Sequence, residues 1–235
     1  MKKIVQSLPY LWFWMFFLIL ALAGGFTYYR VENDRIRKDK YQEIASIAKL
    51  KARQITQWRW ERIADATTTA KSPYFKSSVA EWLRNPGALA LRADLEERLK
   101  LIKKAYAYAD VLLTDTTGRV LLSTLPEPEP LQVEEKRALE EAVAGRKAVL
   151  SDLFRSPKSK VYLDAMEPVL SPEGVPLAAV FLKSDADTFL YPIIRYWPIP
   201  IASAETFLVR RDGNDVLFLN DLVTDPMPPF PCAAP

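Results

Sequence analysis

The sequence has no histidine, a single cysteine and only seven glycines in 235 residues. Without histidine, the chain cannot contain the phospho-accepting histidine of a sensor kinase, a histidine-based triad, a histidine metal site or a histidine-ligated haem. Cys232 has no partner for an internal disulfide, and the few glycines form none of the common phosphate-binding or nucleophile motifs. We therefore predict no catalytic residue, no metal and no cofactor, and we do not expect this chain to be an enzyme.

The sequence also has little excess of charge of either sign. It contains 32 lysine and arginine residues and 29 aspartate and glutamate residues, a formal net charge of +3. The basic residues form no block interleaved with aromatic residues, as a nucleic-acid-binding surface would. A nucleic-acid partner is therefore not expected.

Charge is absent altogether between Lys3 and Arg30. Residues 4–29 are mostly apolar, and a hydrocarbon core of about 30 Å needs roughly 20 such residues in a helix. We predict that residues 1–30 are a cytoplasmic tip and a transmembrane signal anchor, with membrane-facing side chains that include Leu11, Trp12, Phe16 and Leu20. A cleaved leader is the alternative, because residues 21–23 form a small-residue stretch like a cleavage site.

The orientation of the anchor follows less directly from the flanking charges. More lysine and arginine residues follow the apolar segment than precede it, but acidic residues are interleaved among them. Long domains translocate largely regardless of flanking charge. We expect a single-pass membrane protein whose remaining residues form an external domain.

Residues 31–69 are predicted to form one long amphipathic helix. Apolar residues repeat along it at intervals of eleven in two sets, which are Ile36, Ile47 and Trp58, and Ile44, Ile55 and Ala66. Eleven residues make close to three turns, so each set lies on one stripe. The stripe either packs on the protein's own sheet or forms a homodimer contact. With further helices on both sides of a turn at 85–87, residues 31–107 are assigned as the long helix and a helical layer.

Between residues 108 and 200 the hydrophobic period becomes that of strands. Five strands are expected, at 109–114, 119–124, 148–155, 160–168 and 176–184. Gly145 should cap a helix at 132–144, and Asp185 should cap another at 186–196. Sequential antiparallel strands with helices outside them predict an α+β fold with a five-stranded antiparallel sheet.

A second hairpin is predicted within residues 201–222, because two apolar strands around an Asp-Gly turn repeat the pattern of residues 111–122. A lone hairpin is marginally stable in water. Residues 223–235 contain five prolines and cannot continue a sheet, so we expect them to be a Pro-rich disordered tail. Residues 201–222 are therefore interpreted as the start of an incomplete second lobe.

Several segments, taken in order, resemble a known family. They are Trp58–Arg62, Val111–Leu122, Lys160–Val169, Phe189–Ile194 with the following Trp197-Pro198, and Ser203–Asn220. The arrangement resembles the double Cache (tandem PAS-like) extracellular sensor regions of bacterial transmembrane PAS sensor histidine kinases and diguanylate-cyclase receptors. The likeness covers most of the chain, from about Tyr10 to Asp221.

This resemblance implies a ligand-sensing input module of a membrane-bound signal-transduction receptor, with residues 108–200 as the membrane-distal PAS-like Cache lobe. It also implies that the protein is anchored in the bacterial inner membrane and that its domain lies in the periplasm. The sequence lacks the kinase or cyclase output module of such receptors, which we interpret as truncation of a sensor kinase or cyclase. The alternative is a complete single-span membrane-anchored interaction protein that acts through its long helix.

The expected ligand is a small polar metabolite, such as an amino acid or a carboxylate, bound between the sheet and the helix at 132–144. On the strand 160–168, Tyr162 and Asp164 share one face. Arg155 ends the preceding strand, and Tyr108 leads into the first. We predict Tyr108, Arg155, Tyr162 and Asp164 as the ligand-binding residues. The alternative is that they form the water-facing side of an antiparallel sheet.

Overall fold

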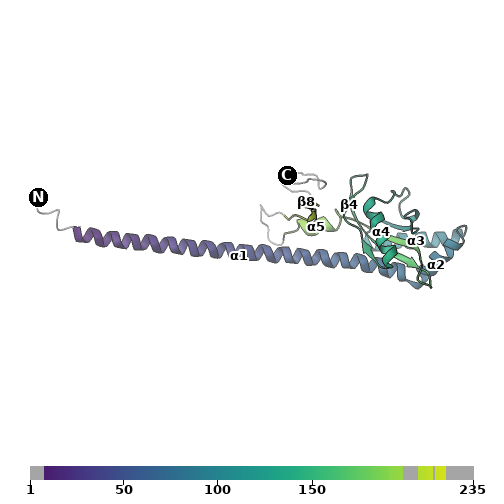
Figure 1. Cartoon of the computed structure of the whole chain (residues 1–235), viewed down its shortest axis with the longest axis horizontal. Helices are drawn as coiled ribbons and strands as arrows, with labels where there is room; N and C mark the ends of the chain where they lie inside the picture. Colours follow the sequence, from purple (N-terminus) through teal and green to yellow (C-terminus); the bar gives the residue numbers. More distant parts are fainter. Residues whose placement is uncertain (1–7, 198–205, 214, 221–235) are drawn as a thin grey trace. The chain divides into compact units, whose positions relative to one another are not determined.

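The computed structural model describes residues 8–197, 206–213 and 215–220. The chain divides into two compact units, Met1–Ala52 and Arg53–Pro235. One helix, α1 (Leu8–Lys71), belongs to both units, so the predicted anchor and long helix form one continuous element (Figure 1). The strands all belong to the second unit.

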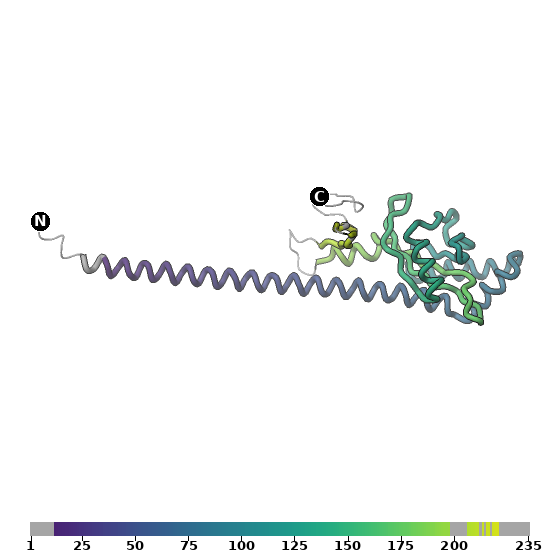
Figure 2. Tube along the Cα trace, in the orientation of Figure 1, coloured from purple at the N-terminus to yellow at the C-terminus, as the bar shows by residue number. Residues whose placement is uncertain are grey.

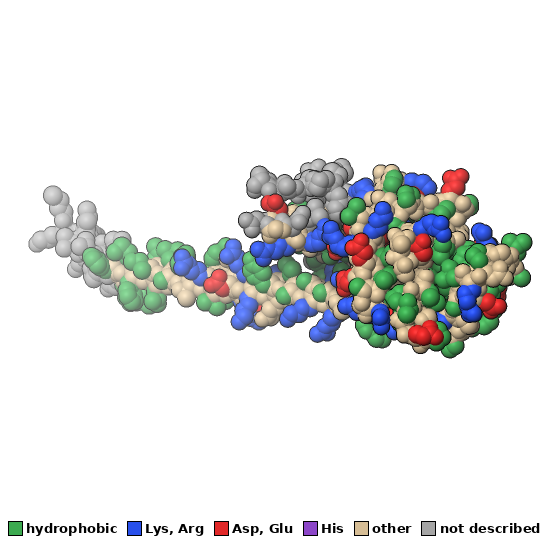
Figure 3. Space-filling view, turned by 45° about the vertical axis from the view of Figure 1, so that its right-hand side comes forward, with side chains coloured by type: hydrophobic (Ala, Val, Ile, Leu, Met, Phe, Trp, Pro, Cys, Tyr) green, Lys and Arg blue, Asp and Glu red, His purple; other side chains and the backbone are tan. Residues whose placement is uncertain are grey.

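The described part of the first unit is the N-terminal portion of α1, which carries the apolar segment. Trp12, Phe16 and Leu20 are 69%, 62% and 57% exposed, and Figure 3 shows apolar side chains covering this portion before the first basic ones. Within the described residues, α1 is the one helix long and apolar enough to cross a membrane, judged by length and composition. The side chain of Leu11 lies outside the described part.

Helices of the second unit form a layer on one side of its sheet. Ser72-Pro73 separates α1 from α2 (Pro73–Arg84), since proline fits the first turn of a helix but not its interior. After the predicted break at 85–87, α3 (Leu89–Tyr106) ends at Ala107, which adopts a left-handed conformation with φ of 55°. The tube in Figure 2 follows the chain from α1 through α2 and α3. The predicted helix break at 85–87 therefore occurs in the structure.

The main sheet is antiparallel throughout. Its order is β2-β1-β6-β5-β3, and β4 also pairs with β5. The strands are β1 (Asp110–Thr114), β2 (Val120–Ser123), β3 (Val149–Leu150), β4 (Phe154–Arg155), β5 (Val161–Leu170) and β6 (Pro176–Asp185). The predicted α+β class is confirmed.

The sheet has six strands rather than five, because the predicted strand 148–155 is divided into β3 and β4. Between the two pieces, the Ser151 N–H donates to the Asp164 carbonyl at 2.8 Å. The Ser151 hydroxyl in turn accepts a hydrogen bond from the Asp164 N–H at 2.9 Å. A side chain thus replaces a backbone carbonyl as the acceptor, and the regular ladder stops there.

The two faces of the main sheet carry separate cores. One face packs against the helical layer, in a cluster that includes Phe75 and Leu99. The other face packs against α4 (Val133–Gly145), which Figure 1 shows lying across the sheet. Consecutive residues of β5 alternate between these cores, with Ala165 in the first and Met166 in the second. Helices therefore cover both faces of the sheet.

α4 begins with a capping box, in which Glu135 Oε2 accepts a hydrogen bond from the Gln132 N–H at 2.6 Å. The predicted cap at its other end is wrong by one residue. The left-handed residue is Arg146, with φ of 51°, and not Gly145. Because the Arg146 N–H bonds to the Ala142 carbonyl, the last turn closes one residue later than expected.

The helix after β6 does not begin at Asp185, which corrects a second predicted cap. Asp185 Oδ1 accepts a hydrogen bond from the Asp187 N–H at 2.9 Å, and the Asp185 carbonyl accepts one from the Thr188 N–H at 3.2 Å. These bonds form a turn. The helix α5 (Leu190–Arg195) follows it.

A separate two-stranded sheet corresponds to the predicted second hairpin. It consists of β7 (Val209–Asp212) and β8 (Asp215–Phe218), and it pairs with no other strand in the described part of the chain. The Tyr191 hydroxyl of α5 donates to the Leu219 carbonyl at 2.7 Å, which attaches the hairpin to the preceding helix. The predicted tail 223–235, with Cys232, lies outside the described residues.

Gly118 closes the β1–β2 hairpin at a position that requires glycine. Its φ is +90°, and an added Cβ would lie 3.1 Å from Leu131 Cδ1 and 3.4 Å from Leu139 Cδ2. We expect Gly118→Ala to lower the free energy of unfolding by about 1–2 kcal/mol, through backbone strain and crowding. Urea unfolding followed by tryptophan fluorescence measures the loss. Gly87→Ala is the control, because its Cβ would meet only Asn85 Oδ1 at 3.7 Å; equal losses would contradict this explanation.

Candidate functional site

Three charged residues lie side by side on the sheet face that α4 covers. In the strand register, Asp110 of β1 is opposite Lys183 of β6, and Lys183 is also opposite Asp164 of β5. Side chains directly opposite in neighbouring strands share one face. The sheet thus places one ammonium group between two carboxyl groups.

The helix α4 adds a fourth charged residue, Glu135. Its Oε1 lies 2.9 Å from Lys183 Nζ, and the two side chains are 0% and 8% exposed. The pair is a close charge contact, since Oε1 makes no directed hydrogen bond. The capping box holds the other carboxylate oxygen of Glu135 and so fixes the side chain over the sheet. We call Asp110, Glu135, Asp164 and Lys183 the buried-charge site.

Two aromatic rings complete the surroundings of the Lys183 ammonium group. It lies 5.5 Å from the ring of Phe154 and 5.3 Å from the ring of Tyr162, within the range of cation–π attraction. Burial lowers the pKa of Lys183, but the carboxyl groups of Asp164 and Glu135 outweigh it, and the net pKa is raised. Lys183 therefore remains a cation in the folded protein.

Asp110 is fully hydrogen-bonded within this site. It accepts hydrogen bonds from the hydroxyl of Ser123 at 2.9 Å and from the N–H of Thr124 at 3.1 Å. The Thr124 hydroxyl and the Val111 N–H donate to it as well. These bonds tie the end of β2 to β1, and a carboxylate with this many donors is satisfied by the protein alone. Asp110 is therefore a structural member of the site.

Asp164 is in the opposite situation. Its side chain is 0% exposed, and neither carboxyl oxygen accepts a hydrogen bond from a donor in the described structure. Lys183 Nζ lies 3.8 Å from Oδ2, which is too long for a hydrogen bond. Burial raises the pKa of Asp164 well above its usual range. The charge of Lys183 opposes this shift, and the charge of Glu135 together with a hydrogen bond to its carboxylate adds to it. Asp164 is the group that a bound ligand could satisfy.

The structure brings together two of the four predicted ligand-binding residues. Tyr162 and Asp164 lie on the α4 face of the sheet, which is covered rather than water-facing. Tyr108 is directed elsewhere: its hydroxyl donates to Asp65 of α1 at 2.6 Å. Arg155 is exposed and donates to the Ser159 carbonyl at 3.2 Å. Neither Tyr108 nor Arg155 contributes to the buried-charge site.

Sequence reasoning missed Lys183, Glu135 and Phe154. One signal was available, since Lys183 follows directly after the apolar run Ala178–Leu182. A lone charge in such a strand is buried and has to be paired. The identity of its partners could not be read from the sequence.

Two ion pairs lie near the Tyr162 end of the site. Lys160 pairs with Asp185, the cross-strand neighbour of Tyr162, at 3.2 Å. Lys158 pairs with Glu129 at 3.4 Å and so links the turn before β5 to the segment that precedes α4. Both lysines are more than half exposed, so these contacts are weak and reversible. No group of residues suited to hold a metal ion occurs in the described chain.

Comparison with known proteins gives information on the fold. A scan against protein-family models found no match, and a search of curated proteins found none. Among solved structures, the chain resembles the sensor domain of the V. cholerae histidine kinase DctB, with a TM-score of 0.51 and 13% identity over 63% of this chain and 57% of that one. It also resembles the extracellular domain of vpHK1S-Z8, assigned as a histidine kinase (0.54; 14% identity; 72% and 63% covered).

A third similar structure is the ligand-binding domain of the Pseudomonas aeruginosa PAO1 amino acid chemoreceptor PctC in complex with GABA. Its TM-score is 0.50, with 16% identity over 76% of this chain and 75% of that one. The chain spans less than two thirds of the first two structures. At these identities the likeness concerns the fold alone. The chain has the fold of Cache-type extracellular sensor domains, as the sequence resemblance predicted.

Proposed function

We propose that this chain is the ligand-sensing input part of a membrane-bound signal-transduction receptor. The α1 helix anchors it in the bacterial inner membrane, and the second unit lies in the periplasm. The observation that carries the proposal is Asp164, a fully buried carboxyl group that accepts no hydrogen bond from a donor in the described structure. Such a group costs free energy unless a ligand or a proton satisfies it.

The chemistry of the buried-charge site favours a small zwitterion, such as an amino acid. An ammonium group on the ligand would hydrogen-bond to Asp164, beside the ring of Tyr162. A carboxylate on the same ligand would pair with Lys183, whose ammonium group is already a cation in the folded state. GABA, bound by the structurally similar PctC domain, is a ligand of this class.

Access to the site requires the segment before α4 to move. This segment is held to the turn before β5 through the Glu129–Lys158 pair, whose lysine side chain is exposed and whose glutamate is half-buried, so the pair contributes little stability. Displacing the segment would also shift α4, because Glu135 belongs to its first turn. Ligand binding would therefore change the contact between α4 and the sheet.

A thermal-unfolding screen of the full chain in lipid nanodiscs tests the proposal. The probes are the common L-amino acids and γ-aminobutyrate, each compared with the corresponding carboxylate that lacks the amine and the amine that lacks the carboxylate. We expect at least one zwitterion to raise Tm, and both of its truncated analogues to act less strongly. Asp164→Asn should remove the response, while Asp187→Asn, an exposed carboxyl on the turn after β6, should retain it.

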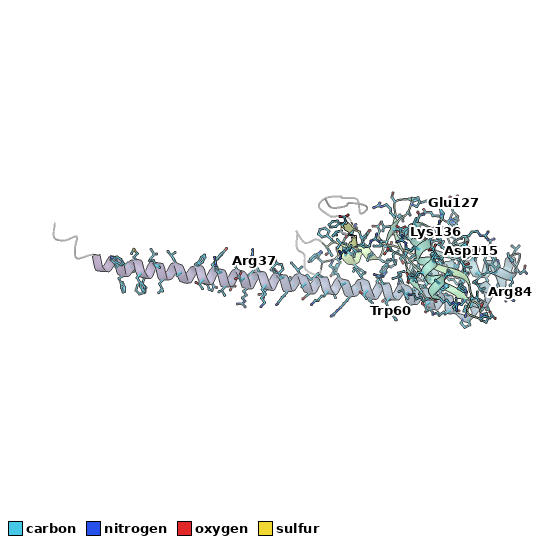
Figure 4. The ribbon with its side chains drawn as sticks, viewed as in Figure 1. Arg37, Trp60, Arg84, Asp115, Glu127 and Lys136 are labelled. Carbon is cyan, nitrogen blue, oxygen red and sulfur yellow. The ribbon has the colours of Figure 1, made fainter. Side chains whose placement is uncertain are left out.

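A second candidate function is interaction with a partner, including a second copy of the chain, through α1. Tyr41 and Trp60 are 73% and 66% exposed on this helix, and Figure 4 shows Trp60 projecting outward from it. If no probe raises Tm and the chain is a dimer in nanodiscs, the second candidate replaces the first.

The Asp187→Asn control can also contradict the assigned site. If both Asp187→Asn and Asp164→Asn lose the Tm response to the zwitterion, the loss is not specific to Asp164.

A further inference from the structure

A cavity lies on the face of the sheet opposite to Asp164. Its volume is about 220 Å³, and its walls come from α1, the segment 151–153, β5, α5 and the β7–β8 hairpin. Because side chains alternate along β5, Leu163 lines this cavity while Asp164 belongs to the buried-charge site. All of the residues that line it belong to the unit Arg53–Pro235. The cavity is thus separate from the proposed sensing site, and binding in it does not depend on the proposed function.

The inner wall of the cavity is apolar. Four leucines with exposures between 2% and 8% line it, which are Leu153, Leu163, Leu190 and Leu219. They belong to one hydrophobic cluster with Trp58. A cavity walled by leucine favours a hydrocarbon group over water. Its size suits a ligand of fragment size, since drug-sized ligands use cavities of about 300 Å³ or more.

The polar side chains that line the cavity offer more hydrogen-bond donors than acceptors. Trp58 is 7% exposed, and its indole Nε1, which can only donate, has no hydrogen-bond partner in the described structure. Arg59, the next residue on α1, also lines the cavity; it is exposed to solvent and forms no ion pair with a described residue. Arg210 lines it too, but Asp152 already pairs with this guanidinium at 3.2 Å. A negatively charged acceptor in the cavity would therefore satisfy Trp58 Nε1 and pair with Arg59.

We propose that this cavity binds a small aliphatic carboxylate. The carboxylate accepts hydrogen bonds from Arg59 and from Trp58 Nε1, and the hydrocarbon chain lies among the leucines. An amine does not fit, because Asp152, the one carboxylate that lines the cavity within the described part of the chain, is already paired. The two sites thus select opposite charges: the buried-charge site lacks a donor for Asp164, and this cavity lacks an acceptor for Trp58.

Calorimetric titration of the full chain in lipid nanodiscs, with hexanoate and hexylammonium as the probes, tests the proposal. We expect hexanoate to bind and hexylammonium not to bind, with empty nanodiscs as the blank. Arg59→Gln should weaken hexanoate binding about tenfold, since a charge-assisted hydrogen bond is lost. Trp58→Phe keeps the ring and removes only the N–H, and should weaken it about fivefold. The matched controls Arg53→Gln and Trp60→Phe change exposed residues of α1 that do not line the cavity, and should leave affinity unchanged.

A second readout locates the carboxylate directly. In chain labelled with ¹⁵N-tryptophan, the indole resonance that is missing from Trp58→Phe should shift downfield on addition of hexanoate, and the Trp60 resonance should not. The Asp164→Asn variant should bind hexanoate as the unmodified chain does, which separates this cavity from the buried-charge site. The proposal is overturned if hexanoate does not bind at about 10 mM, if hexylammonium binds equally well, or if Arg59→Gln and Trp58→Phe leave its affinity unchanged.

Discussion

Lys183→Met is expected to lower the free energy of unfolding by about 3–5 kcal/mol, the range found when one partner of a buried ion pair is removed. Methionine is of similar length and would fill the space, but it leaves the buried Glu135 carboxylate without a cation. It also removes the ammonium group that two aromatic rings contact. Urea unfolding in nanodiscs, followed by tryptophan fluorescence, measures the change.

Lys160→Met is the matched control for this prediction. Lys160 also pairs with an aspartate at the end of a strand, but its side chain is 58% exposed. An exposed pair contributes about 0–1 kcal/mol. If the two variants lose similar amounts of unfolding free energy, burial does not explain the contribution of Lys183 to stability. A loss below about 1 kcal/mol for Lys183→Met would show that the charges at this site are hydrated.

Asp164→Asn is expected to stabilise the ligand-free protein at alkaline pH by about 1–3 kcal/mol, the cost of an unsatisfied buried group. Burial raises the folded-state pKa of Asp164 above its unfolded value of about 3.9. The folded protein therefore holds the proton more tightly than the unfolded chain does. The contribution of Asp164 to the free energy of unfolding is fully present below its unfolded pKa. It is lost as the pH rises through the raised folded pKa.

Asparagine does not titrate. The free energy of unfolding of Asp164→Asn should therefore exceed that of the unmodified protein by an amount that grows with pH. Unfolding free energies measured at a series of pH values give this difference, and other titrating groups cancel from it. Asp187→Asn, which changes an exposed residue, should differ from the unmodified protein by a free energy of unfolding that does not vary with pH. If Asp164→Asn destabilises the protein at all pH values, the carboxyl group is satisfied in the folded state and is not held in reserve for a ligand.

Stability gained together with loss of the ligand response is the combination that a binding residue produces. A residue kept only for packing would be replaced at a cost or without effect. A residue kept for binding retains unfavourable burial because the ligand, when present, offsets it. Asp164 and Lys183 thus differ in a measurable way, although they lie in the same row of the sheet.

The strands could be predicted from the sequence because each is a local pattern. Alternating or apolar runs bounded by turns set the limits of β1, β5 and β6 to within two residues. The anchor and the long helix were expected as separate elements, yet α1 continues through Gly24 and Gly25. Two glycines weaken a helix but do not end it unless the chain turns there.

The site could be predicted only in part, because its residues meet through strand register. Tyr162 and Asp164 were identified from alternation along one strand. The row that joins Asp110, Lys183 and Asp164 depends on the pairing of three strands, two of which are distant from the first in sequence. The direction of the Tyr108 side chain toward Asp65 of α1 could not be predicted for the same reason, since it depends on tertiary packing.

The most direct test of the central claim is the number of protons released when a ligand binds. Titration calorimetry at a series of pH values, each in two buffers of different ionisation enthalpy, measures it with the zwitterion that raises Tm most. Burial raises the pKa of Asp164 in the free protein, and a ligand ammonium group would lower it, so the account predicts a net release of protons in the pH range between the two values. Asp164→Asn should abolish both binding and release. Binding without proton exchange, or release that persists in Asp164→Asn, would contradict the claim that Asp164 receives the ligand.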